Sequence, residues 1–153
     1  MSEIVLNIPA VPVAQPRQRH GIVAGHVRNF TPTKHPVHAF KASVKHELCK
    51  VHKGAPLTGP LTVQVCFVMP RPGRLNLKRL KPWPRVPHVQ KPDCDNLCKS
   101  LFDALNELAW IDDSQVCELL ASKCHASGDE QPHVRVVITE QAGASQGSTV
   151  ADC

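Results

Sequence analysis

Prolines divide this chain into short segments, and they limit where a helix or a strand can run. The sequence has 14 prolines in 153 residues. A proline lacks the backbone N–H that a helix interior or a central strand requires, so regular elements are confined to the stretches between prolines. Pro36 opens one apolar periodic segment, and Gly59-Pro60 and Pro70 enclose another. The chain is therefore expected to hold a few short elements joined by irregular loops.

Apolar periodicity between these breaks predicts two helices. From Pro36 to about Val51, apolar residues recur at intervals of three and four, as they do on one face of an amphipathic helix. From Asp95 to about Ala109 the stripe is clearer. Its members are Leu97, Leu101, Ala104, Leu105 and Leu108. Trp110, at the end of this second helix, is expected in the core.

Four segments have the composition of strands. Leu61–Met69 is rich in β-branched and apolar residues and is expected in the centre of a sheet. Ile4–Ile8 alternates as an edge strand does. Val116–Cys124 and Val134–Thr139, separated by the turn residues 126–132, are expected to join the same sheet.

The length and these elements together predict the fold class. A chain of 153 residues suits one compact domain with one core. We expect an α/β (α+β) fold, with a mixed sheet of about four strands packed with two main helices. The domain is predicted to cover residues 1–140, and the small, polar residues 141–153 are predicted to form a disordered C-terminal tail.

Two proline-rich segments are expected to be irregular and basic. Residues 10–35 are predicted to be a loop that faces phosphate, because they contain no acidic residue. Their basic residues are Arg17, Arg19, His20, His26, Arg28, Lys34 and His35. The basic segment, Arg71–Lys91, mixes prolines with arginines and lysines and is predicted to be a mobile excursion without a long regular element.

The charge is unevenly distributed along the chain. Lysine and arginine number 18 against 13 aspartates and glutamates, which gives a net charge of +5. Only Glu3 and Glu47 are acidic before Asp93, whereas most basic residues lie in that part. Such a distribution suits a polyanionic partner such as nucleic acid.

Other classes of protein are disfavoured by the sequence. No segment approaches the about 20 apolar residues that cross a bilayer, and the first residues lack the pattern of a signal peptide, so a cytoplasmic location is expected. The seven cysteines and nine histidines lack the paired spacing of zinc ligands. The cysteines are expected to be reduced thiols, mostly in the core.

The acidic residues around the second helix form a candidate metal site. Asp93 and Asp95 lie two apart in a segment expected to be extended, so their side chains should point the same way and share a cation. Asp95 is also expected to cap the helix, which places Lys99 one turn above it. Asp112 or Asp113 supplies a third carboxylate if the chain turns back after the helix.

This set of residues suits phosphodiester hydrolysis. Mg²⁺ prefers carboxylate oxygens, water and phosphate as ligands, and Mn²⁺ is the alternative ion for the same ligands. A bound cation activates water and offsets charge in the transition state, while Lys99 stabilises the same charge or protonates the leaving oxygen. Two alternatives stay open: a non-catalytic basic DNA-binding protein in which the aspartates cap helices and turns, and a less selective nuclease for flaps or branched DNA.

Two sequence blocks carry a resemblance to a known family. PDCDNLCKSLFDALN and WIDDSQV are similar to the D-x-D-N-x-x-K-x-x-x-D-A-L-N and D-D-x-Q-V blocks of the RusA Holliday junction resolvases of bacteria and their phages. Weaker similarity extends over about residues 4 to 140. The resemblance implies a small α/β fold, a homodimer, magnesium dependence and symmetrical nicks across a four-way DNA junction during recombination and repair.

The resemblance also assigns roles to residues. It implies that Asp93, Asp95 and Asp113 bind the metal, that Lys99 is the essential lysine and that Asp112 assists as the adjacent acid. Pro92 stands where some members carry arginine, and Lys91 is expected to supply that charge. Lys91 thus joins the residues expected to contact DNA, the others being Arg17, Arg19, Arg28 and Lys34.

Overall fold

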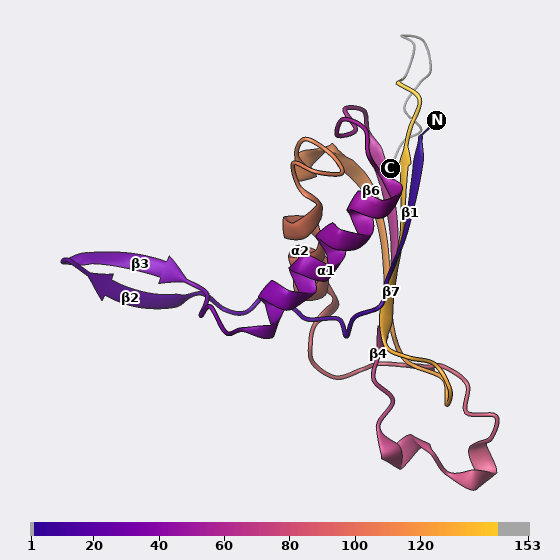
Figure 1. Cartoon of the computed structure of the whole chain (residues 1–153). Coiled ribbons are helices and arrows are strands. Elements are labelled where there is room, and N and C mark those ends of the chain that lie inside the picture. The colour runs from indigo at the N-terminus through magenta and orange to yellow at the C-terminus, as the bar shows by residue number, and fades with distance from the viewer. Residues whose placement is uncertain (1, 144–153) are drawn as a thin grey trace, which may run out of the picture.

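A computed structural model describes residues 2–143 of the chain, apart from the side chains of Arg19 and Leu80. Two helices cover one face of a five-stranded sheet, and a two-stranded ribbon projects from this body (Figure 1). The predicted α+β single domain is confirmed. Within the described range, no helix has both the length and the apolar character needed to cross a bilayer.

The main sheet is mixed and has the strand order β1-β7-β4-β6-β5. Its strands are β1 (Glu3–Ile8), β4 (Leu61–Met69), β5 (Val86–Pro87), β6 (Val116–His125) and β7 (His133–Glu140). β4 pairs in parallel with β6 and antiparallel with β7, and it lies in the centre as its apolar composition predicts. β1 is the predicted edge strand. The fifth strand, β5, has only two residues, too few to show a pattern in the sequence.

The first helix, α1 (Pro36–Val51), forms where the periodicity predicts it. His35 precedes it, and its Nδ1 accepts a hydrogen bond from the Val37 N–H at 3.1 Å, which satisfies one free donor of the first turn. The apolar face of the helix is buried. Its buried residues are Val37, Phe40, Val44 and Leu48.

The second helix, α2 (Cys94–Leu105), is shorter than predicted. Glu107 has a φ of 65°, in the left-handed region that ends helices, so the stripe does not continue to Ala109. Leu108, predicted on the buried face, is 41% exposed as a result. Trp110 follows this turn and is fully buried, as predicted.

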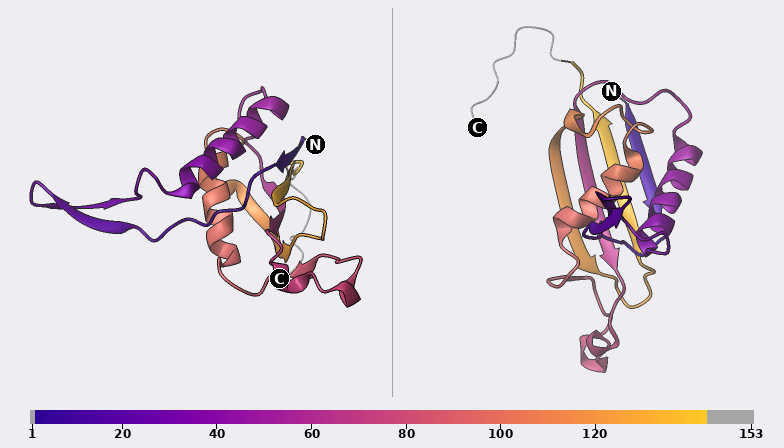
Figure 2. Two further views of the ribbon diagram at one scale, coloured as in Figure 1. Left: turned by 60° about the horizontal axis from the view of Figure 1, so that its bottom comes forward. Right: turned by 90° about the vertical axis from the view of Figure 1, so that its left-hand side faces the viewer.

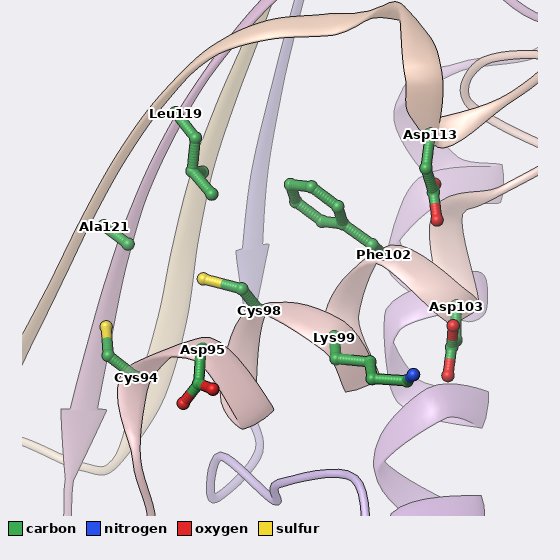
Figure 3. Close-up of a pocket in the computed structure, with 9 residues that line it drawn as sticks. All are labelled: Cys94, Asp95, Cys98, Lys99, Phe102, Asp103, Asp113, Leu119 and Ala121. Atoms are coloured by element: carbon green, nitrogen blue, oxygen red, sulfur yellow. The ribbon is translucent and has the colours of Figure 1, made fainter.

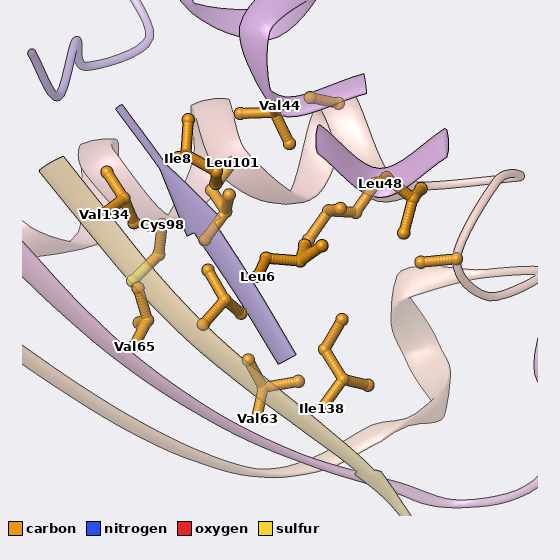
Figure 4. Packing of buried hydrophobic residues seen from close by; sticks show 14 of the residues in the cluster. Leu6, Ile8, Val44, Leu48, Val63, Val65, Cys98, Leu101, Val134 and Ile138 are labelled. Carbon is orange, nitrogen blue, oxygen red and sulfur yellow. The ribbon is translucent and has the colours of Figure 1, made fainter. Parts of the chain in front are cut away.

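The apolar core lies between the sheet and the two helices (Figure 4). Alternate strand residues point toward the helices because successive side chains of a strand face opposite ways. The labelled side chains are Leu6 and Ile8 of β1, Val63 and Val65 of β4, Val134 and Ile138 of β7, Val44 and Leu48 of α1, and Cys98 and Leu101 of α2. The helices therefore owe their position to one continuous apolar layer.

The prediction that residues 10–35 form a loop was wrong in its second half. β2 (Arg19–Val23) and β3 (His26–Phe30) pair antiparallel and form the projecting ribbon. Ala24 and Gly25 join them with φ values of 52° and 79°, the two positive values of a type I′ hairpin turn. Ala-Gly is not the Asn-Gly or Asp-Gly dipeptide by which such turns are recognised, so the sequence signal was weak.

The basic segment contains only short 3-10 turns and β5, which confirms that it lacks a long regular element. Arg71 organises it from within. Its guanidinium donates to Asn76 Oδ1 and to the carbonyls of Leu75, Pro84 and Ala126, at 2.8 to 3.1 Å. This arginine therefore serves the fold of the segment.

Only the first three residues of the predicted tail, 141–143, are described by the structure. Gln141 donates its backbone N–H to Pro60 O at 2.8 Å, beyond the end of β7. Residues 144–153 lie outside the described residues, so the disordered tail stays a prediction.

An ion pair joins the basic segment to the turn between β6 and β7. Arg85 Nε donates to Glu130 Oε1 at 2.8 Å, and Arg85 Nη2 contacts Glu130 Oε2. The Ser127 N–H also donates to Glu130 Oε1 at 3.1 Å. The hydrogen bond from Arg85 lowers the pKa of Glu130 to about 2, and the same bond raises the pKa of Arg85.

Replacing Glu130 by glutamine is expected to lower stability at neutral pH but not in acid. Because the folded pKa is depressed, the contribution of this carboxylate is complete above its ordinary value of 4.5 and is lost as the pH falls toward about 2. Arg85 is half-exposed, so the effect should be at most about 1 kcal/mol. Urea unfolding at three pH values measures it. An equal difference between wild type and Glu130→Gln on both sides of this pH window would contradict the ion pair.

Two leucines that share one sequence stripe should differ in their effect on stability. Leu101 is fully buried, so Leu101→Ala is expected to lower the free energy of unfolding by about 2–5 kcal/mol. Leu108 lies beyond the end of α2 and is 41% exposed, so Leu108→Ala should change it by no more than about 0.5 kcal/mol. Denaturant unfolding of the two variants is the measurement. Similar losses would mean that α2 continues past Glu107.

Candidate functional site

An open pocket of about 600 Å³ lies between α2 and β6 (Figure 3). One side of it is polar and the other apolar. The polar lining residues are Asp95, Lys99, Asp103 and Asp113, and the remaining ones are Cys94, Cys98, Phe102, Leu119 and Ala121. The pocket is wide enough to admit a phosphate group and its surrounding water.

Helix α2 supplies most of the polar side. Asp95, Lys99 and Asp103 are spaced four residues apart, so they form one row along the helix. Asp95 lies in the first turn, where the helix dipole favours a negative charge. Asp103 accepts a hydrogen bond from Lys41 Nζ of α1 at 3.2 Å, so its charge is paired. Within the described residues, Asp95 and Lys99 form no salt bridge.

Asp113 reaches the same pocket from a different element. It begins the 3-10 turn η3 (Asp113–Gln115), which follows the end of α2 and precedes β6. Trp110 Nε1 donates a hydrogen bond to Asp113 Oδ1 at 2.8 Å. A buried indole therefore fixes the orientation of this carboxylate. Asp95 and Asp113 face the pocket from opposite ends of α2.

Asp112 and Asp113 are adjacent but do different work. Asp112 caps η3, because its Oδ1 accepts from the Ser114 N–H at 2.9 Å. Gln115 completes the cap by accepting from the N–H of Asp112 at 2.9 Å. The Gln115 amide also donates to the carbonyls of Leu57 and Gly59, at 2.9 and 3.0 Å. Asp112 and Gln115 thus hold the turn, and Asp113 is the acid of the pair that lines the pocket.

The position of Asp93 differs from the prediction. Asp93 is the N-cap of α2, and Asp95 already belongs to the helix, so the two side chains do not extend in parallel from a strand-like segment. The expected N-cap role of Asp95 was wrong for the same reason. Asp93 is exposed, makes no capping hydrogen bond with its side chain and does not line the pocket. Residues 2–143 include no group of three or more His, Cys, Asp or Glu placed to hold one metal ion.

Lys123 is a site residue that sequence reasoning missed. Its Nζ donates to Gln90 O and to Pro92 O, each at 2.7 Å, and so holds the backbone that leads to Asp93. Lys123 lies on β6, far along the chain from this segment. No local sequence pattern predicts this contact, because it depends on the register of β6 in the sheet.

A second hollow, of about 470 Å³, adjoins the first through Lys99. It is lined by Gln15, Pro16, Arg17, Gln18, His20, Asn96 and Lys99. Arg17, predicted to contact DNA, therefore lies beside the lysine of the site. Arg28, Lys34 and Lys91 are exposed but line neither hollow. Arg19 begins β2, and its side chain is outside the described part.

The two cysteines of the pocket belong to its wall. All the cysteines within the described residues are free thiols, and Cys98 is buried. Burial raises the pKa of the Cys98 thiol to about 12, so the group stays protonated and apolar at neutral pH. Carboxylate oxygens are therefore the candidate metal ligands of this pocket.

Fold and site together define a small α+β protein whose open pocket joins carboxylates to an exposed lysine, next to a hollow that contains arginine. The sequence matches the family Endodeoxyribonuclease RusA over residues 9–139. The chain therefore belongs to the RusA family, and the resemblance stated from the two sequence blocks is confirmed. It is also 35% identical over 144 residues to the Uncharacterized protein YqaN of Bacillus subtilis (strain 168), which covers 92% of this chain and 98% of that protein.

Proposed function

We propose that this protein is a Mg²⁺-dependent endodeoxyribonuclease that resolves Holliday junctions by paired, symmetrical hydrolysis of phosphodiesters in opposing strands. The observation that carries the proposal is the pocket that Asp95, Lys99 and Asp113 line together. Membership of the RusA family supports the same reaction. The enzyme would act in DNA recombination and repair in the cytoplasm, encoded by a bacterium or its phage.

The carboxylates of the site fit a hard divalent cation. Mg²⁺ is usually held by one or two carboxylates, with water and substrate phosphate completing its octahedron. Asp95 can supply one such carboxylate, with water and phosphate as the other ligands, whereas Asp113 lines the pocket from the other end of α2 and would not reach the same ion. Asp93 adds a carboxylate at the same end of α2 as Asp95, and no capping hydrogen bond engages it. Mn²⁺ uses the same oxygen ligands and is expected to substitute.

The protein groups around the cation have separate tasks. When bound, Mg²⁺ lowers the pKa of a coordinated water and offsets negative charge on the reacting phosphate. Lys99 is exposed and without a carboxylate partner among the described residues, so its ammonium is available to a phosphate oxygen or to the leaving oxygen. Trp110 keeps Asp113 directed into the pocket. Lys41 neutralises Asp103 and so reduces the repulsion of an incoming phosphate.

Asp95→Asn is expected to reduce Mg²⁺-dependent cleavage of a synthetic four-way junction by at least about 100-fold, because a neutral amide is a poor ligand for this ion. Junction binding should be unchanged or tighter, since one charge that repels phosphate is removed. Asp129→Asn is the matched control, because Asp129 is exposed in the turn between β6 and β7. Cleavage is measured on labelled junction, flap and linear duplex DNA.

The outcomes separate the three candidate functions. Paired nicks in opposing junction strands by wild type and Asp129→Asn, but not by Asp95→Asn, support the resolvase. Equal cleavage of flaps and linear duplex would favour the less selective nuclease. Junction binding without cleavage under any divalent ion would favour the non-catalytic DNA-binding protein.

The outer edge of β6 suits the homodimer that paired cleavage requires. On that side β6 pairs only with β5, through the last two residues of β6, so the edge from Cys117 to Ser122 has no strand partner within the described chain. Leu119 and Leu120 are 45% and 64% exposed on this strand, and Ile111 is exposed just before it. A long, apolar free edge favours pairing with another chain. Two copies joined along β6 around a two-fold axis would each present one pocket.

Leu120→Glu is expected to convert a dimer into a monomer. The charge would be buried in the proposed interface, while the fold should survive because Leu120 is 64% exposed in the single chain. Leu77→Glu is the control, since Leu77 is an exposed leucine of the basic segment. Sedimentation velocity reports the molecular mass of both variants and of wild type. A dimer that persists in Leu120→Glu would place the interface elsewhere.

A further inference from the structure

The ribbon formed by β2 and β3 is a large feature of the described chain that the proposed chemistry leaves unused. It extends away from the sheet and the helices in Figure 1 and in the left view of Figure 2, and it points toward the viewer in the right view of Figure 2. Its strands pair with each other and with no strand of the main sheet. The ribbon therefore contributes little to the core, and most of its side chains are exposed to solvent.

Apolar side chains gather at the tip of the ribbon. Ile22 is 79% exposed, Val23 is 56% exposed and Val27 is 68% exposed. Val23 adjoins the Ala24-Gly25 turn, and Ile22 pairs with Val27 one position further from it, so all three lie near the end of the ribbon. Three exposed β-branched residues at the end of an arm are unfavourable in water unless they contact a partner.

One side-chain contact within the ribbon holds its two strands together. The ring of Phe30 lies across Gly21, where a Cβ atom would come within 2.9 Å of Phe30 Cε1. An aromatic ring that covers a glycine on the neighbouring strand stabilises a two-stranded ribbon. Gly21 thus lets the ring close over the backbone of the neighbouring strand.

The charge around the tip favours a polyanion over a protein surface of mixed charge. The ribbon carries Arg28, and Arg17 lies in its root, the residues 13–18 that lead into β2. No acidic residue occurs between Glu3 and Glu47. An apolar tip on a basic stem matches DNA, whose phosphates attract the stem and whose stacked bases accept the apolar side chains.

The root of the ribbon is fixed to the helix that carries the site. The Gln15 N–H donates to Asn96 O at 3.0 Å, and Ser100 Oγ donates to Val13 O. The second hollow, between Arg17 and Lys99, lies at this junction of root and helix. A DNA strand bound across both hollows would therefore pass the root of the ribbon.

We propose that the ribbon is a wedge, and that Ile22, Val23 and Val27 enter the branch point of the junction and unstack the bases there. This inference rests on the proposed function. Apolar side chains that insert between base steps offset the free-energy cost of unstacking by making new contacts. That cost is lowest where stacking is already interrupted. A branch point is such a place, so the wedge would also help the enzyme to prefer junctions over linear duplex.

The test uses four-way junctions with 2-aminopurine either at the branch point or within an arm, in the absence of divalent metal so that no cutting occurs. Wild type should increase the fluorescence of the branch-point probe and leave the arm probe unchanged. The double variant Ile22→Ser, Val27→Ser should lose that increase and bind the junction about tenfold more weakly, with unchanged affinity for duplex. Val51→Ser, an exposed valine at the end of α1, is the matched control.

The outcomes also distinguish this inference from the proposed function. A full fluorescence increase with the double variant, or no increase with wild type that still cuts junctions in Mg²⁺, would overturn the wedge alone. Loss of dimerisation in the double variant, measured by sedimentation, would show that the tip contacts a second copy instead and would also overturn it. If wild type neither prefers nor cuts junctions, the proposed function fails, and the wedge fails with it. Unchanged duplex affinity excludes misfolding as the cause.

Discussion

The packing of α2 against the sheet is the interaction on which the site depends. Leu97, Leu101 and Leu105 are fully buried, and they fix the rotation of the helix about its axis. Because residues four apart share a face, that rotation turns Asp95 and Lys99 outward in one row. The root of the ribbon is attached to the same helix, because the Gln15 N–H donates a hydrogen bond to Asn96 O. A change in the seating of α2 would therefore move the carboxylate, the lysine and the arm together.

The second carboxylate depends on how the chain leaves α2. Glu107 adopts a left-handed conformation, which stops the helix and returns Trp110 to the core. The buried indole then donates to Asp113, and the cap made by Asp112 and Gln115 holds the turn. Asp113 is thus placed by the core, whereas Asp95 is placed by a helix. Each carboxylate has its own support, and neither needs the other to be correctly oriented.

The sequence predicted the parts of this arrangement that are local. Apolar spacing located α1, α2 and the central strand β4, and the spacing of Asp95 and Lys99 put them on one helical face. The return of Asp113 was beyond such reasoning, because it requires the end of α2 at Glu107 and the burial of Trp110. Lys123 was missed because its contact with Pro92 depends on strand register. The ribbon was missed because its Ala-Gly turn uses a dipeptide that rarely signals a hairpin.

The placement of acidic residues matters more than the net charge of +5. Asp103 is paired with Lys41, Glu130 with Arg85, and Asp112 with a backbone N–H of its own turn. These acidic side chains already have partners within the fold, so they present little unpaired negative charge to a phosphate backbone. Asp95 has no such partner among the described residues, and it stands beside Lys99. The basic residues of the surrounding surface therefore attract a polyanion. The unpaired carboxylate of Asp95 repels a phosphate unless a cation is bound between them.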